Sequence, residues 1–245
     1  MQLRFLGTGA SGGTPGRGRS RRRESSLLLK ADSHILIDVT RDFGDQARGL
    51  DRIDSILITH AHRDACGGVG QLRAWWQSRG GGEPIPVYAH RGTIVAIRRR
   101  LSRLDHCRFT EVRAGSRKRL GEWTVTALEV PHAPEPHHPT FAWRLRRSDR
   151  TIVYASDVAR LTPQLRRFAA EASVLVIDGA MWGRQLFSHL TIDAELPRLC
   201  DWGVDTILLT QLGKTLPPHE RLEREVRALC PRARPAHDGL VFPLR

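Results

Sequence analysis

The sequence is poor in several features that would place it in other protein classes. It has four cysteines in 245 residues, Cys66, Cys107, Cys200 and Cys230, and none forms a CxxC pair or a spacing typical of a zinc knuckle or a disulfide framework. We therefore expect reduced thiols, most of them buried. No uninterrupted apolar segment is long enough to cross a bilayer, and the first residues lack the basic and apolar regions of a signal peptide. These absences predict a cytoplasmic protein with no membrane partner.

Lysine is also scarce. Only Lys30, Lys118 and Lys214 are lysines among 39 basic residues, so arginine carries the formal net charge of +13. A basic excess can indicate nucleic acid, because clustered cations release counterions from phosphates. Here arginine is spread over the whole chain, with dense runs at residues 17–23 (RGRSRRR) and 98–103 (RRRLSR). We favour a solvated loop or face for both runs over a specific polyanion site.

Short apolar and β-branched runs bounded by turn residues predict strands, and apolar residues at helical spacing lie between some of them. The strand segments are residues 2–7, 25–31, 34–39, 55–60, 85–90, 123–130, 141–146, 151–156, 173–179 and 206–211. The helical segments are residues 67–80, 91–104, 162–172, 191–203 and 217–230. Strands dominate the first half, and strand alternates with helix in the second. We expect an α/β protein of two packed sheets with helices outside, as a single domain over residues 1–245.

Polar side chains that can bind metal follow several of the predicted strands. His60 and His62 come after the apolar run SILIT, and two imidazoles two residues apart on an extended chain lie on the same side and can reach one ion. Asp64 continues this alternation. The ends of other strands carry His132, Asp157, Asp178 and Gln211. Any one of these is more often a hydrogen-bonded histidine or a capping aspartate, so the prediction of one shared cleft depends on the whole set.

Taken in order, these motifs resemble the metallo-β-lactamase fold hydrolases, and within them the branch of tRNase Z and the phosphoribosyl cyclic phosphate phosphodiesterase. The resemblance covers nearly the whole chain, from LGTGASGGTP through ILIDV, THAHRDACGG, PHAP, YASDVA, LVIDGA, SHLTIDAEL and LLTQLG to HDGLVF. It implies a four-layer αββα sandwich. It also implies a first metal site made of His60, His62 and His132, with Asp157 bridging to a second ion.

The second site departs from the pattern of the family. The resemblance implies Asp64 and two further ligands there, but Ala65 and Gln211 hold those two positions. A neutral amide is a poor replacement for imidazole on zinc. Three interpretations remain: a mononuclear enzyme, a weak second ion held by Asp64 and Asp157 with Gln211 or Cys66 nearby, or a binding module that has lost catalysis. We favour the mononuclear enzyme, with zinc as the ion and manganese or iron as alternatives.

Other residues are candidates for substrate contact. The resemblance implies that His189 is a general acid for the leaving oxygen or stabilises charge on the phosphoryl group. The alternative is that it merely precedes the helix that starts near Thr191. Lys214 could supply the charge of the missing ion, and Arg21 in the first arginine run could attract an anion. Gln211 is a further candidate for contact with the substrate. We expect Cys66 to be a small buried thiol, and His137 and His138 to belong to a proline-rich surface loop.

The leading hypothesis is a metal-dependent phosphodiesterase for a small anionic or cyclic phosphate ester. Metal-activated water would attack phosphorus, Asp64 would orient or deprotonate that water, and His189 would assist the leaving group. The alternatives are a nuclease of the tRNase Z type, for which the sequence lacks a long inserted arm, and a ligand or nucleic-acid binding module. An exposed edge strand or helix pair leaves a homodimer open.

Overall fold

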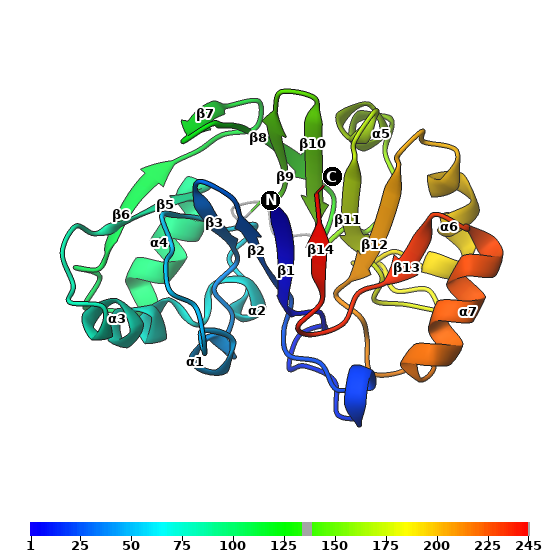
Figure 1. The fold of residues 1–245 in the computed structure, drawn as a ribbon, viewed down its shortest axis with the longest axis horizontal. Helices are drawn as coiled ribbons and strands as arrows, with labels where there is room; N and C mark the ends of the chain where they lie inside the picture. Colours follow the sequence, from blue (N-terminus) through cyan, green and yellow to red (C-terminus); the bar gives the residue numbers. More distant parts are fainter. Residues whose placement is uncertain (134–138, 245) are drawn as a thin grey trace.

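Two seven-stranded β-sheets pack face to face, and helices cover the outer face of each sheet (Figure 1). The structure is a computed structural model that describes residues 1–133 and 139–244, so His137 and His138 lie outside the described residues. The strand order is β14-β1-β2-β3-β4-β5-β6 in the first sheet and β13-β12-β11-β10-β9-β8-β7 in the second. These layers confirm the predicted αββα sandwich.

The strands of each sheet come from nearly separate parts of the chain. The first sheet contains β1 (Gln2–Gly7), β2 (Ser26–Lys30), β3 (His34–Ile37), β4 (Ser55–Leu57), β5 (Ile85–Ala89), β6 (Cys107–Glu111) and β14 (Val241–Pro243). The second contains β7 (Arg117–Leu120), β8 (Trp123–Val130), β9 (Thr140–Arg147), β10 (Arg150–Ala155), β11 (Val174–Asp178), β12 (Thr206–Thr210) and β13 (Ala233–Pro235). The helices are α1 (Phe43–Gln46), α2 (Arg63–Cys66), α3 (Val69–Ser78), α4 (Arg91–Arg100), α5 (Pro163–Ala169), α6 (Ile192–Cys200) and α7 (His219–Leu229), with a 3-10 turn η1 (Gly18–Ser20).

Every predicted strand and helical segment contains an element of the expected type. The strands that the sequence did not predict, β6, β7, β13 and β14, are the outermost strands of the two sheets. An outer strand pairs on one side only and often carries charged residues, which hides the apolar alternation. β7 has the sequence RKRL and β13 has the sequence ARP, so neither has an apolar run to recognise.

The apolar side chains form three layers of core. The middle core lies between the sheets and contains Phe5 and Leu27 from the first sheet and Trp123 and Trp143 from the second. The other two cores lie between the first sheet and α1, α3 and α4, and between the second sheet and α5, α6 and α7. Successive residues of a strand point to opposite faces, so the strands between two cores read as almost continuous apolar runs.

The directions of the strands bring distant residues to one edge of the sandwich. β3, β4, β5 and β6 are parallel to one another, and so are β10, β11, β12 and β13. Loops that leave the carboxyl ends of such strands gather side chains from separate segments. In the part of the chain that the structure describes, no helix has the length and apolar character needed to span a membrane.

The cysteines differ from the expectation of reduced thiols. Cys200 at the end of α6 and Cys230 just after α7 form a disulfide, with their Cα atoms 5.7 Å apart. The prediction was therefore wrong for this pair, because packing of α6 on α7 brings together residues that no sequence spacing marks. Cys66 and Cys107 are free, and Cys66 is buried as predicted.

Candidate metal site

Three imidazoles from two separate segments converge on one point. His60 and His62 lie between β4 and α2, and His132 follows β8. Their ring centroids are 4.6 Å (His60–His62), 5.2 Å (His60–His132) and 5.3 Å (His62–His132) apart. One ring nitrogen of each lies within 4.8 Å of the others. This spacing suits ligands around one tetrahedral ion, each about 2.0–2.1 Å from it.

Neighbouring groups orient two of these rings. The Thr59 hydroxyl donates to both carboxylate oxygens of Asp38 at 3.0 Å and lies 2.9 Å from Nδ1 of His60, so it accepts from that nitrogen. His132 donates from Nδ1 to the carbonyl oxygen of Ser188 at 2.8 Å. Both bonds place the lone pair of the ring on Nε2, and in His132 this atom lies 3.4 Å from Nδ1 of His62. Asp38, Thr59 and Ser188 were not predicted from the sequence, although Asp38 also stands at a strand end.

The chemistry of His60 provides a test of whether an ion fits here. Its Nε2 is buried and has no hydrogen-bond partner among residues 1–133 and 139–244. Burial lowers the pKa of His60 to about 4, although the nearby carboxylates of Asp157 and Asp64 act in the opposite direction. The ring is therefore neutral at physiological pH, which is the form that binds metal. A buried lone pair that faces two other imidazoles fits one cation.

Asp64 reaches the site by a route that the sequence did not predict. It lies in the first turn of α2 and not on an extended chain, so the predicted alternation ends at His62. The turn still brings its Oδ1 to 4.0 Å from Nε2 of His60, and only 8% of the side chain is exposed. Ala65 follows in the same turn, buried, and offers no ligand.

Gln211 connects the two carboxylates of the expected second site. Its Nε2 lies 2.8 Å from Oδ1 of Asp157 and 3.2 Å from Oδ2 of Asp64. A carboxylate can only accept, so the amide nitrogen is the end that faces both aspartates. Gln211 follows β12 with a φ of 56°, a left-handed conformation that a glutamine rarely adopts. The backbone here holds the amide between Asp64 and Asp157.

Asp157 lies between the imidazoles and Gln211. Its Oδ1 is 3.7 Å from Nε2 of His132, and its Oδ2 accepts from the Ser156 hydroxyl at 2.6 Å. Burial alone would raise the pKa of Asp157, but His60, His132 and His189 outweigh it and lower the pKa to about 2. Asp157 is therefore a carboxylate that can bind a cation next to His132.

His189 lies next to both His132 and Asp157: its ring centroid is 5.0 Å from that of His132, and one ligand atom of each of the three residues lies within 4.8 Å of the others. Its Nδ1 donates to Oδ2 of the fully buried Asp178 at 2.7 Å. Burial opposes the charged ring, but the charge and hydrogen bond of Asp178 prevail and raise the pKa of His189 to about 9. The ring is thus a protonated imidazolium that can donate a proton at neutral pH. Asp178 also accepts from the backbone of Val158 and Ala180, which fixes its position.

The remaining candidates lie around this cluster. Lys214 is exposed, and its Nζ lies beside Gly12 of the glycine-rich segment. Arg21 is exposed and lines a hollow of about 620 Å³ together with Gly12. Cys66 donates from its thiol to the carbonyl oxygens of Ala61 and His62, and burial raises its pKa to about 12. Cys66 is therefore a neutral buried thiol.

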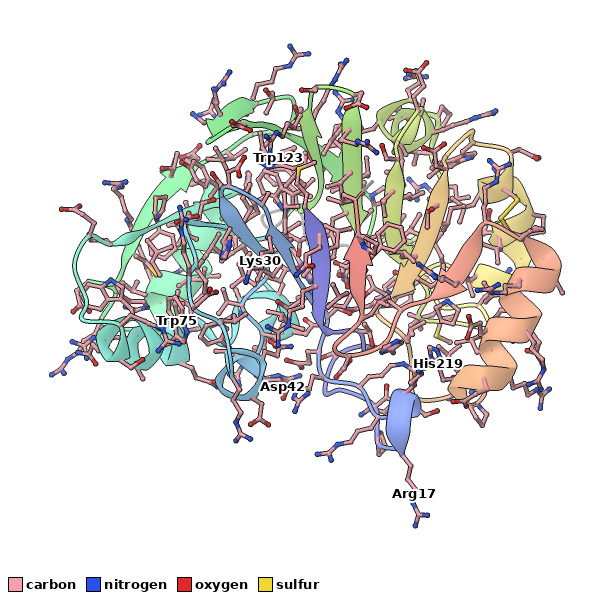
Figure 2. All side chains as sticks on the ribbon, in the orientation of Figure 1. Arg17, Lys30, Asp42, Trp75, Trp123 and His219 are labelled. Atoms are coloured by element: carbon pink, nitrogen blue, oxygen red, sulfur yellow. A yellow bond between two sulfur atoms is a disulfide. The ribbon has the colours of Figure 1, made fainter. Side chains whose placement is uncertain are left out.

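The first arginine run is only partly the solvated loop that we predicted. Arg17 projects from the tip of the segment (Figure 2), and Arg19 and Arg21 are also exposed. In contrast, Arg22 is buried with a nitrogen 3.5 Å from Nδ1 of His219. Arg23 pairs with Asp238 and Asp45. In the second run, Arg98, Arg99, Arg100 and Arg103 are exposed, as predicted.

Comparison with known proteins identifies the family. Residues 33–211 match the family model described as "Beta-lactamase superfamily domain". The chain belongs to this superfamily. Its likeness to solved structures supports the metallo-β-lactamase fold, which is a fold of metal-dependent hydrolases.

Three of these structures cover the whole chain. A diphosphatase from the PhnP family is 23% identical with a TM-score of 0.88, and the match covers 100% of this chain and 98% of that one. Zn²⁺-bound PqqB from Methylobacterium extorquens is 20% identical with a TM-score of 0.84, and the short form of human tRNase Z is 20% identical with a TM-score of 0.72. Both of these matches cover 100% of each chain.

One curated relative is a longer protein. The octanoyltransferase of Porphyromonas gingivalis (strain ATCC BAA-308 / W83) is 25% identical over 264 residues, which cover 98% of this chain and 51% of the relative. The chain therefore spans about half the length of that protein.

Proposed function

We propose that the chain is a metal-dependent hydrolase of a small anionic or cyclic phosphate ester and that it works with one metal ion. His60, His62 and His132 would hold the ion, with Asp157 as a fourth ligand. The observation that carries the proposal is the convergence of three ring nitrogens within 4.8 Å. One of them is the buried Nε2 of His60, which has no hydrogen-bond partner in the described part of the chain. We propose zinc, with manganese or iron as alternatives, and the zinc-bound PqqB structure supports this choice.

The contacts of Gln211 are the reason that we propose one metal ion and not two. Two buried carboxylates that face each other need a cation or a hydrogen-bond donor between them. The amide of Gln211 is that donor for Asp64 and Asp157, where the resemblance implies a second ion. Ala65 removes a further ligand from the same place. We therefore propose that a protein amide takes the position of the second cation and that the chain binds one metal ion.

Each residue then has a separate task. A bound ion supplies a Lewis acid for the phosphoryl oxygen and for water. Asp64, held by Gln211, accepts a hydrogen bond from the attacking water and orients it toward phosphorus. His189, protonated and fixed by Asp178, donates a proton to the leaving oxygen. Arg21 and Lys214 lie beside the glycine-rich segment, where their charges attract an anionic substrate.

The choice of phosphate ester rests on the relatives and on charge. The diphosphatase of the PhnP family and tRNase Z act on phosphate compounds, and both share the fold along the whole chain. The alternatives are a tRNase Z-like nuclease and a binding module without catalysis.

We also propose that residues 1–245 form one domain, because the middle core takes side chains from both sheets.

Metal content and a substrate screen test this proposal. Elemental analysis of the purified protein should give about one equivalent of metal, and bis-p-nitrophenyl phosphate or a cyclic phosphate should be hydrolysed. His132→Ala should lose both the metal and the activity. His34→Gln is the matched control and should keep both. His34 starts β3, which is parallel to β4, so it lies at the strand end opposite to the one that leads to His60 and His62. A protein without metal would support the binding module, and two equivalents would refute the mononuclear site.

A further inference from the structure

One corner of the second sheet carries an exposed face made of arginine and threonine. β7, β8 and β9 are neighbours at the end of this sheet. On one side, β8 and β9 send Trp123, Val125 and Trp143 into the middle core, and Figure 2 labels Trp123 there. The other side carries the alternate residues: Arg117, Arg119, Thr124, Thr126, Arg144 and Arg146. We call these six residues the arginine face.

The strand register arranges the arginine face as two parallel rows. Arg117 pairs with Thr126, which pairs with Arg144. Arg119 pairs with Thr124, which pairs with Arg146. Each row thus has an arginine at both ends and a threonine between them. Residues two apart on a strand are roughly 7 Å apart, and alternate strands are roughly 10 Å apart, so the arginines mark the corners of a rectangle of about that size.

The four arginines concentrate positive charge on this face. In residues 1–133 and 139–244, none of its arginines forms an ion pair with a carboxylate. Glu122 lines the same hollow, but its carboxylate pairs with Arg147. The guanidinium of Arg144 lies 4.6 Å from the ring centroid of Phe168 on α5. Burial and the like charges of Arg117 and Arg146 lower the pKa of Arg144, so these cations repel one another.

The helices leave this corner open. The side chain of Arg144 meets α5, and beyond it the strands border a hollow of about 730 Å³. Arg117, Arg119 and Arg146 are exposed, as is Thr124. The described residues that line the hollow are arginine, threonine, serine and one glutamate, without an aromatic or large aliphatic side chain. The face can therefore offer forked donors and hydroxyls, but no apolar anchor.

We propose that the arginine face binds the phosphodiester backbone of a nucleic acid. Guanidinium groups match phosphate oxygens with paired hydrogen bonds. The strand spacings distribute the four arginines over corners roughly 7 Å by 10 Å apart, an area over which they can meet several phosphates along a strand. A protein partner would need apolar anchors at its centre, which this face lacks. Without aromatic side chains the bases cannot stack, so binding does not depend on nucleotide sequence.

The arginine face is separate from the candidate metal site. β8 carries Thr124 and Thr126 near its start and leads to His132 after its end. At about 3.4 Å per residue, the six residues from Thr126 to His132 span roughly 20 Å. Nucleic-acid binding by this face therefore does not rest on the proposed hydrolase activity, and it can be measured with the metal removed.

Fluorescence anisotropy with labelled single-stranded oligouridine, over a series of salt concentrations and with a chelator present, tests this surface. The main variant is Arg117→Gln with Arg146→Gln, which removes two opposite corners and spares Arg144, which packs on Phe168. We expect a loss of affinity of about tenfold or more. The slope of log affinity against log salt concentration (the salt slope) should become shallower by roughly 1.4, because each lost phosphate contact on a single strand reduces this slope by about 0.7. Arg117→Lys with Arg146→Lys should restore most of the slope, since it keeps the charge.

The matched control is Arg99→Gln with Arg103→Gln, two exposed arginines of the second arginine run. It removes the same charge and should keep the affinity and slope of the unaltered protein. Equal loss in the control and the main variant would overturn the proposal, because it would indicate a diffuse effect of net charge. Unchanged binding in the main variant would also overturn it, as would binding to phosphatidylglycerol vesicles or to polyglutamate without binding to oligouridine. Circular dichroism and the melting temperature should show that all variants are folded.

Discussion

Gln211 donates from its amide nitrogen to the carboxylate of Asp157, 2.8 Å away, and the same nitrogen lies 3.2 Å from Asp64. This bond occupies the place where the resemblance to metallo-β-lactamase fold hydrolases implies a metal ion. Two carboxylates that would repel each other are linked by a side chain of the protein. Several properties of the molecule should depend on this arrangement.

The second metal site should be recoverable by substitution. Ala65→His with Gln211→His replaces a methyl group and a donor by two imidazoles beside Asp64 and Asp157. We expect the metal content to rise from about one equivalent toward two, measured by elemental analysis after dialysis. Ala65→His alone is the control and should stay near one, because Gln211 still bridges the carboxylates. If the double variant also stays at one, the amide is not what excludes the second ion.

The ion pair of His189 and Asp178 should make the stability of the metal-free protein depend on pH. The pKa of His189 is raised to about 9 in the folded protein, from an ordinary value of 6.5. When folding raises the pKa of a group, the added stability is fully present at pH values below the pKa of that group in the unfolded chain. It is lost as the pH rises through the pKa of the group in the folded protein. The contribution is on the order of 3 kcal/mol, since each unit of pKa corresponds to about 1.4 kcal/mol.

Urea denaturation of the metal-free protein and of His189→Gln at pH 6, 7.5 and 9.5 measures this effect. The difference in unfolding free energy between the two proteins should be largest at pH 6 and should shrink toward pH 9.5. A difference that is constant over this range would mean that the ring is neutral in the folded protein.

The exposed arginines of the loop should affect substrate capture and not the chemical step. Arg19→Gln with Arg21→Gln removes two exposed positive charges, and of these Arg21 lines the hollow next to Gly12. We expect KM for an anionic phosphodiester to rise severalfold while kcat changes little, because the lost attraction acts on the ground state and transition state alike. Steady-state kinetics at low and high salt measure this, and the difference between the proteins should fall at high salt. A fall in kcat with constant KM would instead place the loop in the chemical step.

The disulfide between Cys200 and Cys230 should be detectable by counting thiols. Unfolding without reductant should expose two reactive thiols, Cys66 and Cys107, and unfolding with reductant should expose all four. Cys200→Ser with Cys230→Ser should lower the unfolding free energy by about 3 kcal/mol, because the open loop regains conformational freedom when unfolded. Four reactive thiols without reductant would contradict the bond.

The sequence predicted the parts of this structure that repeat a local rule. The apolar runs marked the inner strands, and polar residues after those runs marked His60, His62, His132, Asp157 and Gln211. Outer strands such as β7 were missed, because pairing on one side leaves no continuous apolar pattern. Cys200 and Cys230 were missed for a different reason, since only the packing of α6 on α7 brings them together.

Asp64 and Gln211 show where local reasoning ends. The alternation of His60, His62 and Asp64 suggested an extended chain, but a helical turn begins after His62 and still returns the carboxylate to the site. The sequence alone showed that Gln211 holds a position where the resemblance implies an imidazole. The direction of its amide could not be predicted from the sequence, because that depends on Asp64 and Asp157, which lie far away along the chain.

The histidines of the candidate metal site come from opposite halves of the sandwich. His60 and His62 belong to the first sheet, and His132 belongs to the second. Next to them, the backbone of Phe141 in β9 donates to the carbonyl oxygen of Thr59. An ion held by all three imidazoles therefore binds only when the halves are docked, so binding and docking are thermodynamically linked. At a free metal concentration one hundred times Kd, the ion adds about 2.7 kcal/mol to the cohesion of the two sheets.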